Sequence, residues 1–140
     1  MIVDYSSIYG LEGVYLEDSY VLSILETPGR FVFVLDAVLT PEHSQYRPPR
    51  PGEQYCYEQA HLDFEEVTAI CWLRMVFSES RDATGSVDLG NIDTLTSNGN
   101  RYTITGDWGE VEVLSSKRPR FHLQGPRAVT AEFGPTISWS

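Results

Sequence analysis

The side chains that could bind a metal ion gather in the middle of the sequence. They are two histidines, one cysteine and three glutamates: His43, Cys56, His61, Glu42, Glu53 and Glu58. A zinc site needs three or four nitrogen, sulfur or oxygen ligands that converge on one point. The tight spacings of such sites are missing, and Cys56 and His61 lie five residues apart, on opposite faces of a strand. We therefore expect no metal ligand and no cofactor, and keep a metal-dependent enzyme only as the least favoured alternative.

A second set of oxygen ligands lies in the acidic loop 82–93. Its oxygens at positions 82, 84, 86, 88 and 93 follow the spacing of a calcium-binding loop. Val87 stands where that loop needs glycine, and Asp93 stands where it needs the longer glutamate. An ordinary turn-rich loop, in which Asp and Asn side chains bond their own backbone, is the favoured interpretation.

Nucleophilic and acid–base catalysis are not favoured by the remaining motifs. A Cys with a His and an acid is available. However, the sequence contains no Gly-x-Ser-x-Gly elbow, no glycine-rich phosphate loop and no His-Glu-x-x-His motif. The acidic pairs Glu17–Asp18 and Glu65–Glu66 are adjacent, so on strands their carboxylates would face opposite ways. We expect no catalytic residue.

Large side chains at positions that need not be buried suggest a binding surface instead. The candidate partner-binding residues are Tyr46, Arg47, Tyr55, Tyr57, Glu58 and Trp108. Tyr, Trp and Arg dominate the energetics of protein interfaces. The structural alternative is that Trp108 folds back over a sheet and the tyrosines pack under the neighbouring loop.

The charge of the chain restricts its partners. The 140 residues carry a net charge of −10, and residues 1–80 alone hold thirteen acidic and four basic side chains. This field repels nucleic acid and anionic membrane surfaces. It favours a basic protein partner, a cationic ligand or a metal ion, although acidity can also serve solubility alone.

Alternating and β-branched segments predict an all-β fold. Two hairpins are expected, one from strands 20–25 and 31–39 across a Pro-Gly turn, and one from strands 101–105 and 110–114. Segment 31–39 is apolar on both faces and predicts a central strand. Further strands are expected at 14–16, 53–64, 67–77, 121–123 and 128–133.

Two long loops interrupt these strands. Residues 40–52 contain four prolines, which exclude a helix or a central strand, and residues 78–100 are polar with one short strand. Eight or nine strands with at most one short helix predict a single domain over 1–140, an antiparallel β-sandwich or flattened barrel. Cys56 and Cys71 are expected to be buried free thiols.

The sequence as a whole favours a non-catalytic binding protein. Its size, its acidity and its lack of catalytic motifs are similar in composition to bacterial immunity-type inhibitors, which mask a basic partner surface, although no family motif supports this. A small-ligand-binding β-barrel is the main alternative. Without a basic leader or a long apolar run, the sequence predicts a cytoplasmic protein, either monomer or homodimer.

Overall fold

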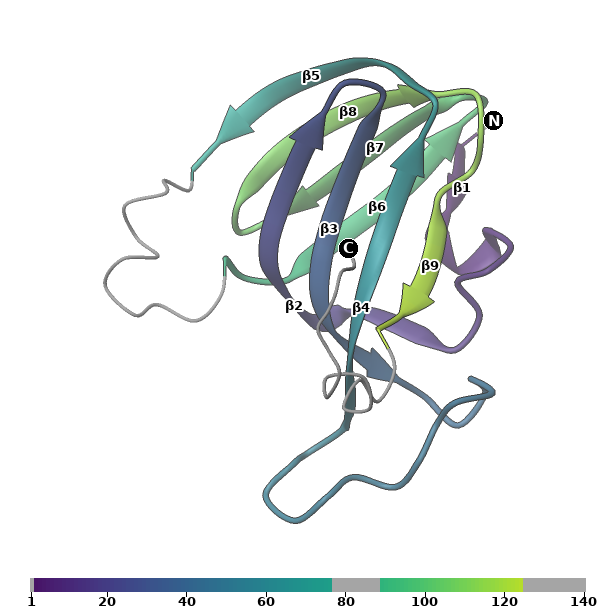
Figure 1. Cartoon of the computed structure of the whole chain (residues 1–140), viewed down its shortest axis with the longest axis vertical. Helices are drawn as coiled ribbons and strands as arrows, with labels where there is room; N and C mark the ends of the chain where they lie inside the picture. The colour runs from purple at the N-terminus through teal and green to yellow at the C-terminus, as the bar shows by residue number, and fades with distance from the viewer. Residues whose placement is uncertain (1, 77–88, 125–140) are drawn as a thin grey trace, which may run out of the picture.

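Two antiparallel sheets packed face to face form the protein, as a computed structural model that describes residues 2–76 and 89–124 shows (Figure 1). The first sheet has the strand order β1-β6-β7-β8-β5 and the second has the order β2-β3-β4-β9. The strands are β1 (Ile2–Asp4), β2 (Val14–Thr27), β3 (Arg30–Leu39), β4 (Cys56–Glu65), β5 (Val67–Met75), β6 (Ile92–Asn98), β7 (Arg101–Gly106), β8 (Gly109–Ser115) and β9 (Arg120–Leu123). The described strands do not close into a barrel, so the sandwich prediction is confirmed and the flattened barrel is wrong.

The first predicted hairpin is formed by β2 and β3. Its register pairs Thr27 with Arg30 across a turn in which Gly29 takes a φ of 77°. This conformation suits glycine because it has no Cβ. β3 lies between β2 and β4 and is buried on both faces, as its continuous apolar sequence predicts.

The second predicted hairpin is formed by β7 and β8. Tyr102 pairs with Val113 and Ile104 pairs with Val111, so apolar side chains face the core together. Gly106 and Gly109 close the turn. A Cβ at Gly106 would overlap the carbonyl oxygen of Asn91, because the chain passes very close at this point.

Aromatic side chains fill the centre of the sandwich. Trp108 lies 5.1 Å from Phe33 and 5.9 Å from Trp72, measured between ring centroids, and its indole N–H donates to the carbonyl of Asn91 at 2.9 Å. Phe31 contacts Phe33 and Trp72. These rings join the two sheets, because Phe31 and Phe33 come from β3 while Trp72 comes from β5.

Several elements depart from the sequence-based expectations. The strands expected at 14–16 and 20–25 form one continuous strand, β2, and β1 and a 3-10 helix (Tyr5–Ser7) precede it. The short strand expected within the polar segment 78–100 is present as β6, whereas residues 77–88 and the strand expected at 128–133 lie outside the described residues. β5 is a sheet edge, and Cys71 on it is exposed, so the prediction of a buried Cys71 is wrong; Cys56 is buried as expected.

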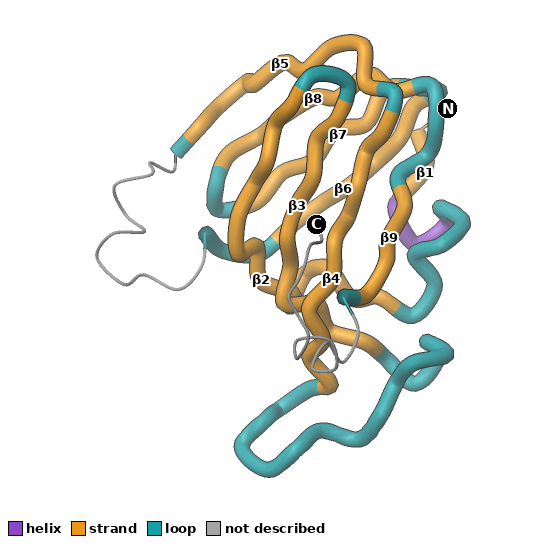
Figure 2. The backbone as a smooth tube through the Cα atoms, in the orientation of Figure 1, coloured by secondary structure: helices purple, strands orange, loops and turns teal. Residues whose placement is uncertain are grey.

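The proline-rich segment is a long loop that projects from one end of the sandwich, between β3 and β4 (Figure 2). Pro41, Pro48, Pro49 and Pro51 leave no strand over residues 40–52, as predicted. The described residues contain no helix with the length and apolar character needed to cross a bilayer.

Candidate tyrosine–carboxylate face

An irregularity in β2 places two tyrosines on the outer face of the four-stranded sheet. Tyr15 pairs with Val38 and Tyr20 pairs with Asp36, so five steps along β2 correspond to two along β3. In a regular strand, residues five apart point to opposite faces. Here their partners Val38 and Asp36 lie two apart on β3, so Tyr15 and Tyr20 share the outer face, where both are about 40% exposed.

Ser19 holds this irregularity in place. It is fully buried, and its hydroxyl donates to the carbonyl of Tyr15 at 2.8 Å. The same oxygen accepts a hydrogen bond from the backbone N–H of Val38 at 2.9 Å. A backbone group left unpaired where the ladder is interrupted would be costly to bury. The Ser19 hydroxyl satisfies that group and fixes the spacing between the two tyrosines.

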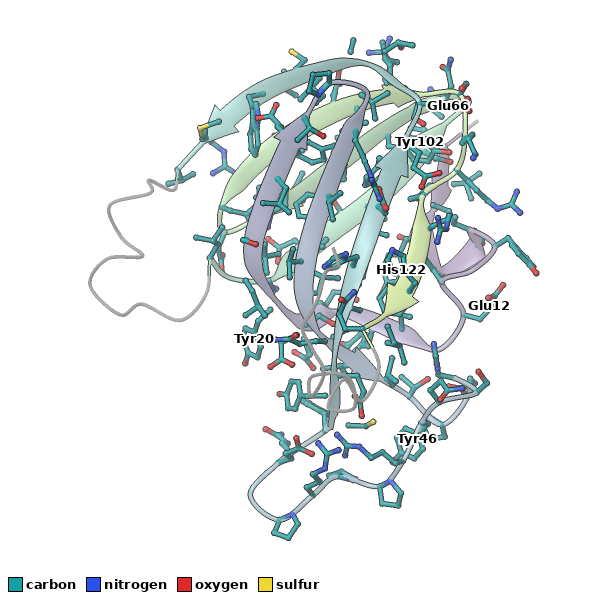
Figure 3. The ribbon with its side chains drawn as sticks, in the orientation of Figure 1. Glu12, Tyr20, Tyr46, Glu66, Tyr102 and His122 are labelled. Atoms are coloured by element: carbon teal, nitrogen blue, oxygen red, sulfur yellow. The ribbon has the colours of Figure 1, made fainter. Side chains whose placement is uncertain are left out.

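The end of β4 and the residue before it complete the aromatic cluster. Tyr57 stacks on Tyr20 with ring centroids 6.2 Å apart, and Tyr55 meets Tyr57 edge to face at 6.1 Å. Tyr57 and Tyr15 both pair with Val38, from the two sides of β3, so they lie on the same face with β3 between them. Figure 3 shows Tyr20 at the end of the sheet from which the proline loop projects.

Two carboxylates accompany the tyrosines. Hydrogen bonding to Asp18, followed by the Asp18 charge, raises the pKa of Tyr55. Burial raises the pKa of Tyr57, and a hydrogen bond shared with Tyr20 and the charge of Asp36 raise it further. We call Tyr15, Tyr20, Tyr55 and Tyr57, together with Asp18 and Asp36, the tyrosine–carboxylate face.

The neighbouring acid Glu17 belongs to a different environment. It accepts a hydrogen bond from the hydroxyl of Tyr5 at 2.6 Å, and that hydroxyl in turn accepts the N–H of Leu16. Burial and this contact raise the pKa of Tyr5. The two adjacent carboxylates therefore lie in different environments: Glu17 pairs with Tyr5, and Asp18 belongs to the tyrosine–carboxylate face.

Arg47 anchors the proline loop beside this face. Its guanidinium donates to Glu58 at 2.9 Å, to Glu53 at 3.1 Å, to the carbonyl of Tyr57 at 2.8 Å and to that of Pro48 at 3.1 Å. Four bonds from a planar donor fix the loop against β4. Arg47 and Glu58, both predicted as partner contacts, are thus engaged with each other and position the loop.

Two other predicted contact residues are packed inward. Trp108 is 1% exposed in the core, so its expected exposure at a hairpin tip is wrong and the folded-back alternative is right. The tip is short, and the indole reaches the space between the sheets. Tyr46 is partly buried and packs against the hydrophobic core. Of the six predicted residues, Tyr55 and Tyr57 are the ones that lie on the tyrosine–carboxylate face.

The metal-ligand candidates are not brought together. Cys56 is buried in the core, whereas His61 lies on the outer face of β4, where burial and then His122 lower the pKa of His61. His43 lies in the proline loop, where its Nδ1 accepts the N–H of Gln45 at 2.9 Å. Among the residues that the structure describes, no three His, Cys, Asp or Glu side chains form a group suited to a metal ion. Most of the acidic loop 82–93 lies outside those residues.

Sequence reasoning missed Tyr15, Asp18, Tyr20 and Asp36. Residues 17–19 interrupt an otherwise apolar strand with two acids and a serine, and this interruption is the available signal. Because the number of extra residues decides which face each tyrosine takes, periodicity alone could not place them together.

The arrangement is suited to binding a cation. The π-faces of tyrosines attract guanidinium and ammonium groups, and adjacent carboxylates pair with them. Comparison with known proteins adds no functional information, since no family model, curated protein or solved structure matches this chain.

Proposed function

We propose that this protein is a non-catalytic binding module whose tyrosine–carboxylate face recognises a basic segment of a protein partner. The observation that carries the proposal is the convergence of four tyrosines and two carboxylates from β2, β3 and the β4 region on one outer face. Tyrosine supplies large contact area with few rotatable bonds, so it loses little entropy on binding.

The charge of the whole molecule supports the same partner chemistry. With a net charge of −10, the chain attracts a basic protein over distance and speeds the encounter. The tyrosines would then slow dissociation, because aromatic contacts exclude water from the ion pairs. On the basis of its composition, we propose that this module is a small acidic inhibitor of the immunity type.

A nuclear magnetic resonance titration tests the location of this face. A short peptide of alternating Arg and Gly is added to the isotopically labelled protein, and the corresponding Glu and Gly peptide serves as the comparison. We expect the arginine peptide to shift amide signals of Tyr15, Asp18, Tyr20, Tyr55 and Tyr57. The glutamate peptide should leave them unchanged, because the face offers no cation to it.

A matched pair of variants separates specific recognition from the general acidity of the protein. Asp18→Asn removes one charge from the face, and Glu110→Gln removes one charge from β8 on the other sheet. We expect Asp18→Asn to weaken peptide binding severalfold and Glu110→Gln to change it by less than about twofold. Equal effects, or shifts spread over both sheets, would show that the face is not a specific site.

A further inference from the structure

A pocket lined by basic side chains lies between β9 and the N-terminal loop, at the edge of the four-stranded sheet that is away from β2. Its volume is about 660 Å³, within the range of small-molecule sites. The pocket walls are formed by Tyr9, Gly10, Ser116, Lys117, Arg118, Pro119, Arg120, Phe121 and His122. Figure 3 shows His122 on β9 and Glu12 on the neighbouring loop.

The lining is basic although the protein is strongly acidic. Lys117, Arg118 and Arg120 contribute three positive charges, and no carboxylate is among the lining residues. Lys117 and Arg120 each reach the carboxylate of Glu65, at 3.3 Å and 3.1 Å. Both cations are about half exposed, and such surface pairs contribute little to stability. They therefore remain able to attract an anion.

Arg118 is held differently from the other two cations. Its guanidinium carbon lies 4.7 Å from the ring centre of Tyr9. Within the part of the chain that the structure describes, no carboxylate forms an ion pair with Arg118. The aromatic ring orients the guanidinium while leaving its N–H donors available, and planar guanidinium groups bind phosphate and carboxylate oxygens in pairs.

His122 lines the same wall, but its Nε2 lies against Asp63 of β4. Its Nε2 is buried and has no hydrogen-bond partner among the described residues. The nearest carboxylate oxygen, on Asp63, is 3.7 Å away, and Asp63 accepts two hydrogen bonds from Arg30 instead. Because this Nε2 is buried beside the Asp63 carboxylate, the groups in the pocket that can contact an anion are Arg118, Lys117 and Arg120.

We propose that this pocket binds a small organic anion bearing two or more phosphate or carboxylate oxygens, with Arg118 as the main contact. Lys117 and Arg120 supply further positive charge, and Tyr9, which is 70% exposed, offers a ring surface beside the anion. The proposal is independent of the tyrosine–carboxylate face, which lies at another place on the molecule and selects the opposite charge.

Isothermal titration calorimetry with two probes tests the pocket. Inorganic pyrophosphate represents a phosphate ligand and citrate represents a polycarboxylate, each added at low ionic strength to the full chain. We expect at least one probe to bind saturably. Arg118→Gln should weaken that binding about tenfold, the usual scale for one charge-assisted contact. Binding of pyrophosphate alone assigns a phosphate ligand, and binding of citrate alone assigns a carboxylate.

The matched control is Arg101→Gln, which removes the same charge from β7, where Arg101 pairs with Glu112. This variant should bind the probe within about twofold of the unchanged protein. Tyr20→Ala, on the tyrosine–carboxylate face, should also leave anion binding unchanged. The proposal is overturned if neither probe binds up to about 10 mM, or if Arg118→Gln and Arg101→Gln bind equally well.

Discussion

Ser19 is the single side chain on which the spacing of Tyr15 and Tyr20 depends. Ser19→Ala removes both of its hydrogen bonds and leaves the Val38 N–H buried without that partner. We expect the free energy of unfolding to fall by about 1–2 kcal/mol, measured by urea denaturation. Ser23→Ala in the same strand is the control and should change it by less than about 0.5 kcal/mol. If both variants are equally stable, Ser19 does not hold the irregularity.

Asp63 should make stability depend on pH in the acid range. Its side chain, on β4, is fully buried, and the Arg30 guanidinium donates two hydrogen bonds to its carboxylate, one of them 3.0 Å long. Burial opposes ionisation of Asp63, but the bonds and charge of Arg30 outweigh it and hold its pKa below the ordinary value. A lowered pKa stabilises the folded state above the unfolded pKa, and this contribution is lost as pH falls through the folded value.

The free energy of unfolding should therefore decline below about pH 4 as Asp63 takes up its proton. Asp63→Asn removes this component, so the variant should be about 1–2 kcal/mol less stable at pH 7 and approach the unchanged protein in acid. Arg30 is half exposed, which keeps the loss below that of a fully buried pair. Arg30→Gln should flatten the same part of the profile. Parallel profiles for all three proteins would contradict this role.

At the scale of elements, the β7–β8 hairpin depends on close contact with β5. Gly109 has a φ of 139°, and a Cβ there would overlap the carbonyl oxygen of Arg74. Gly99, between β6 and β7, has a φ of 67° with open space around it. We expect Gly99→Ala to cost about 1 kcal/mol from backbone strain alone, and Gly109→Ala to cost more than about 3 kcal/mol. Thermal unfolding of both variants measures the difference, and equal losses would rule out the close contact.

The two cysteines report on the difference between an inner strand and an edge strand. Cys56 on β4 is 1% exposed, whereas Cys71 on β5 is exposed. A thiol must be accessible to react. With a colorimetric thiol reagent, one thiol per chain should react in the native protein and a second only after denaturation. Loss of the fast reaction in Cys71→Ser would assign it, and two fast thiols would contradict the burial of Cys56.

The sequence predicts those elements whose signals are local. The alternation of apolar and polar residues in β4 correctly separated the inward Ala60 and Leu62 from the outward Tyr57 and His61. The turn residues correctly predicted the positions of both hairpins. Strand order is not a local property, so the apolar segment of β5 gave no sign that it forms an edge with Leu73 and Met75 exposed. Hairpin tips likewise look exposed in sequence, although Trp108 turns into the core.

The whole molecule carries two regions of opposite chemical preference on one sandwich. The tyrosine–carboxylate face lies at the loop end of β2, β3 and β4, and the basic pocket lies beside β9. The first region could be predicted only in part, through Tyr55 and Tyr57. The second combines Tyr9 with residues more than a hundred positions away, so no local pattern in the sequence indicated it.

Affinity capture of proteins from the source lysate with matched baits, followed by mass spectrometry of the bound proteins, tests the proposed partner most directly. The baits are the unchanged protein, a Tyr20→Ala/Tyr55→Ala double variant, and Tyr9→Ala, which removes an exposed tyrosine elsewhere. Each bait is washed at low and then high salt, because electrostatic encounter weakens as salt screens charge. We predict one basic protein that binds the unchanged and Tyr9→Ala baits, is released as salt rises, and is lost by the double variant. Capture of the same proteins by all three baits, or of none by the unchanged protein, would contradict recognition through the tyrosine–carboxylate face.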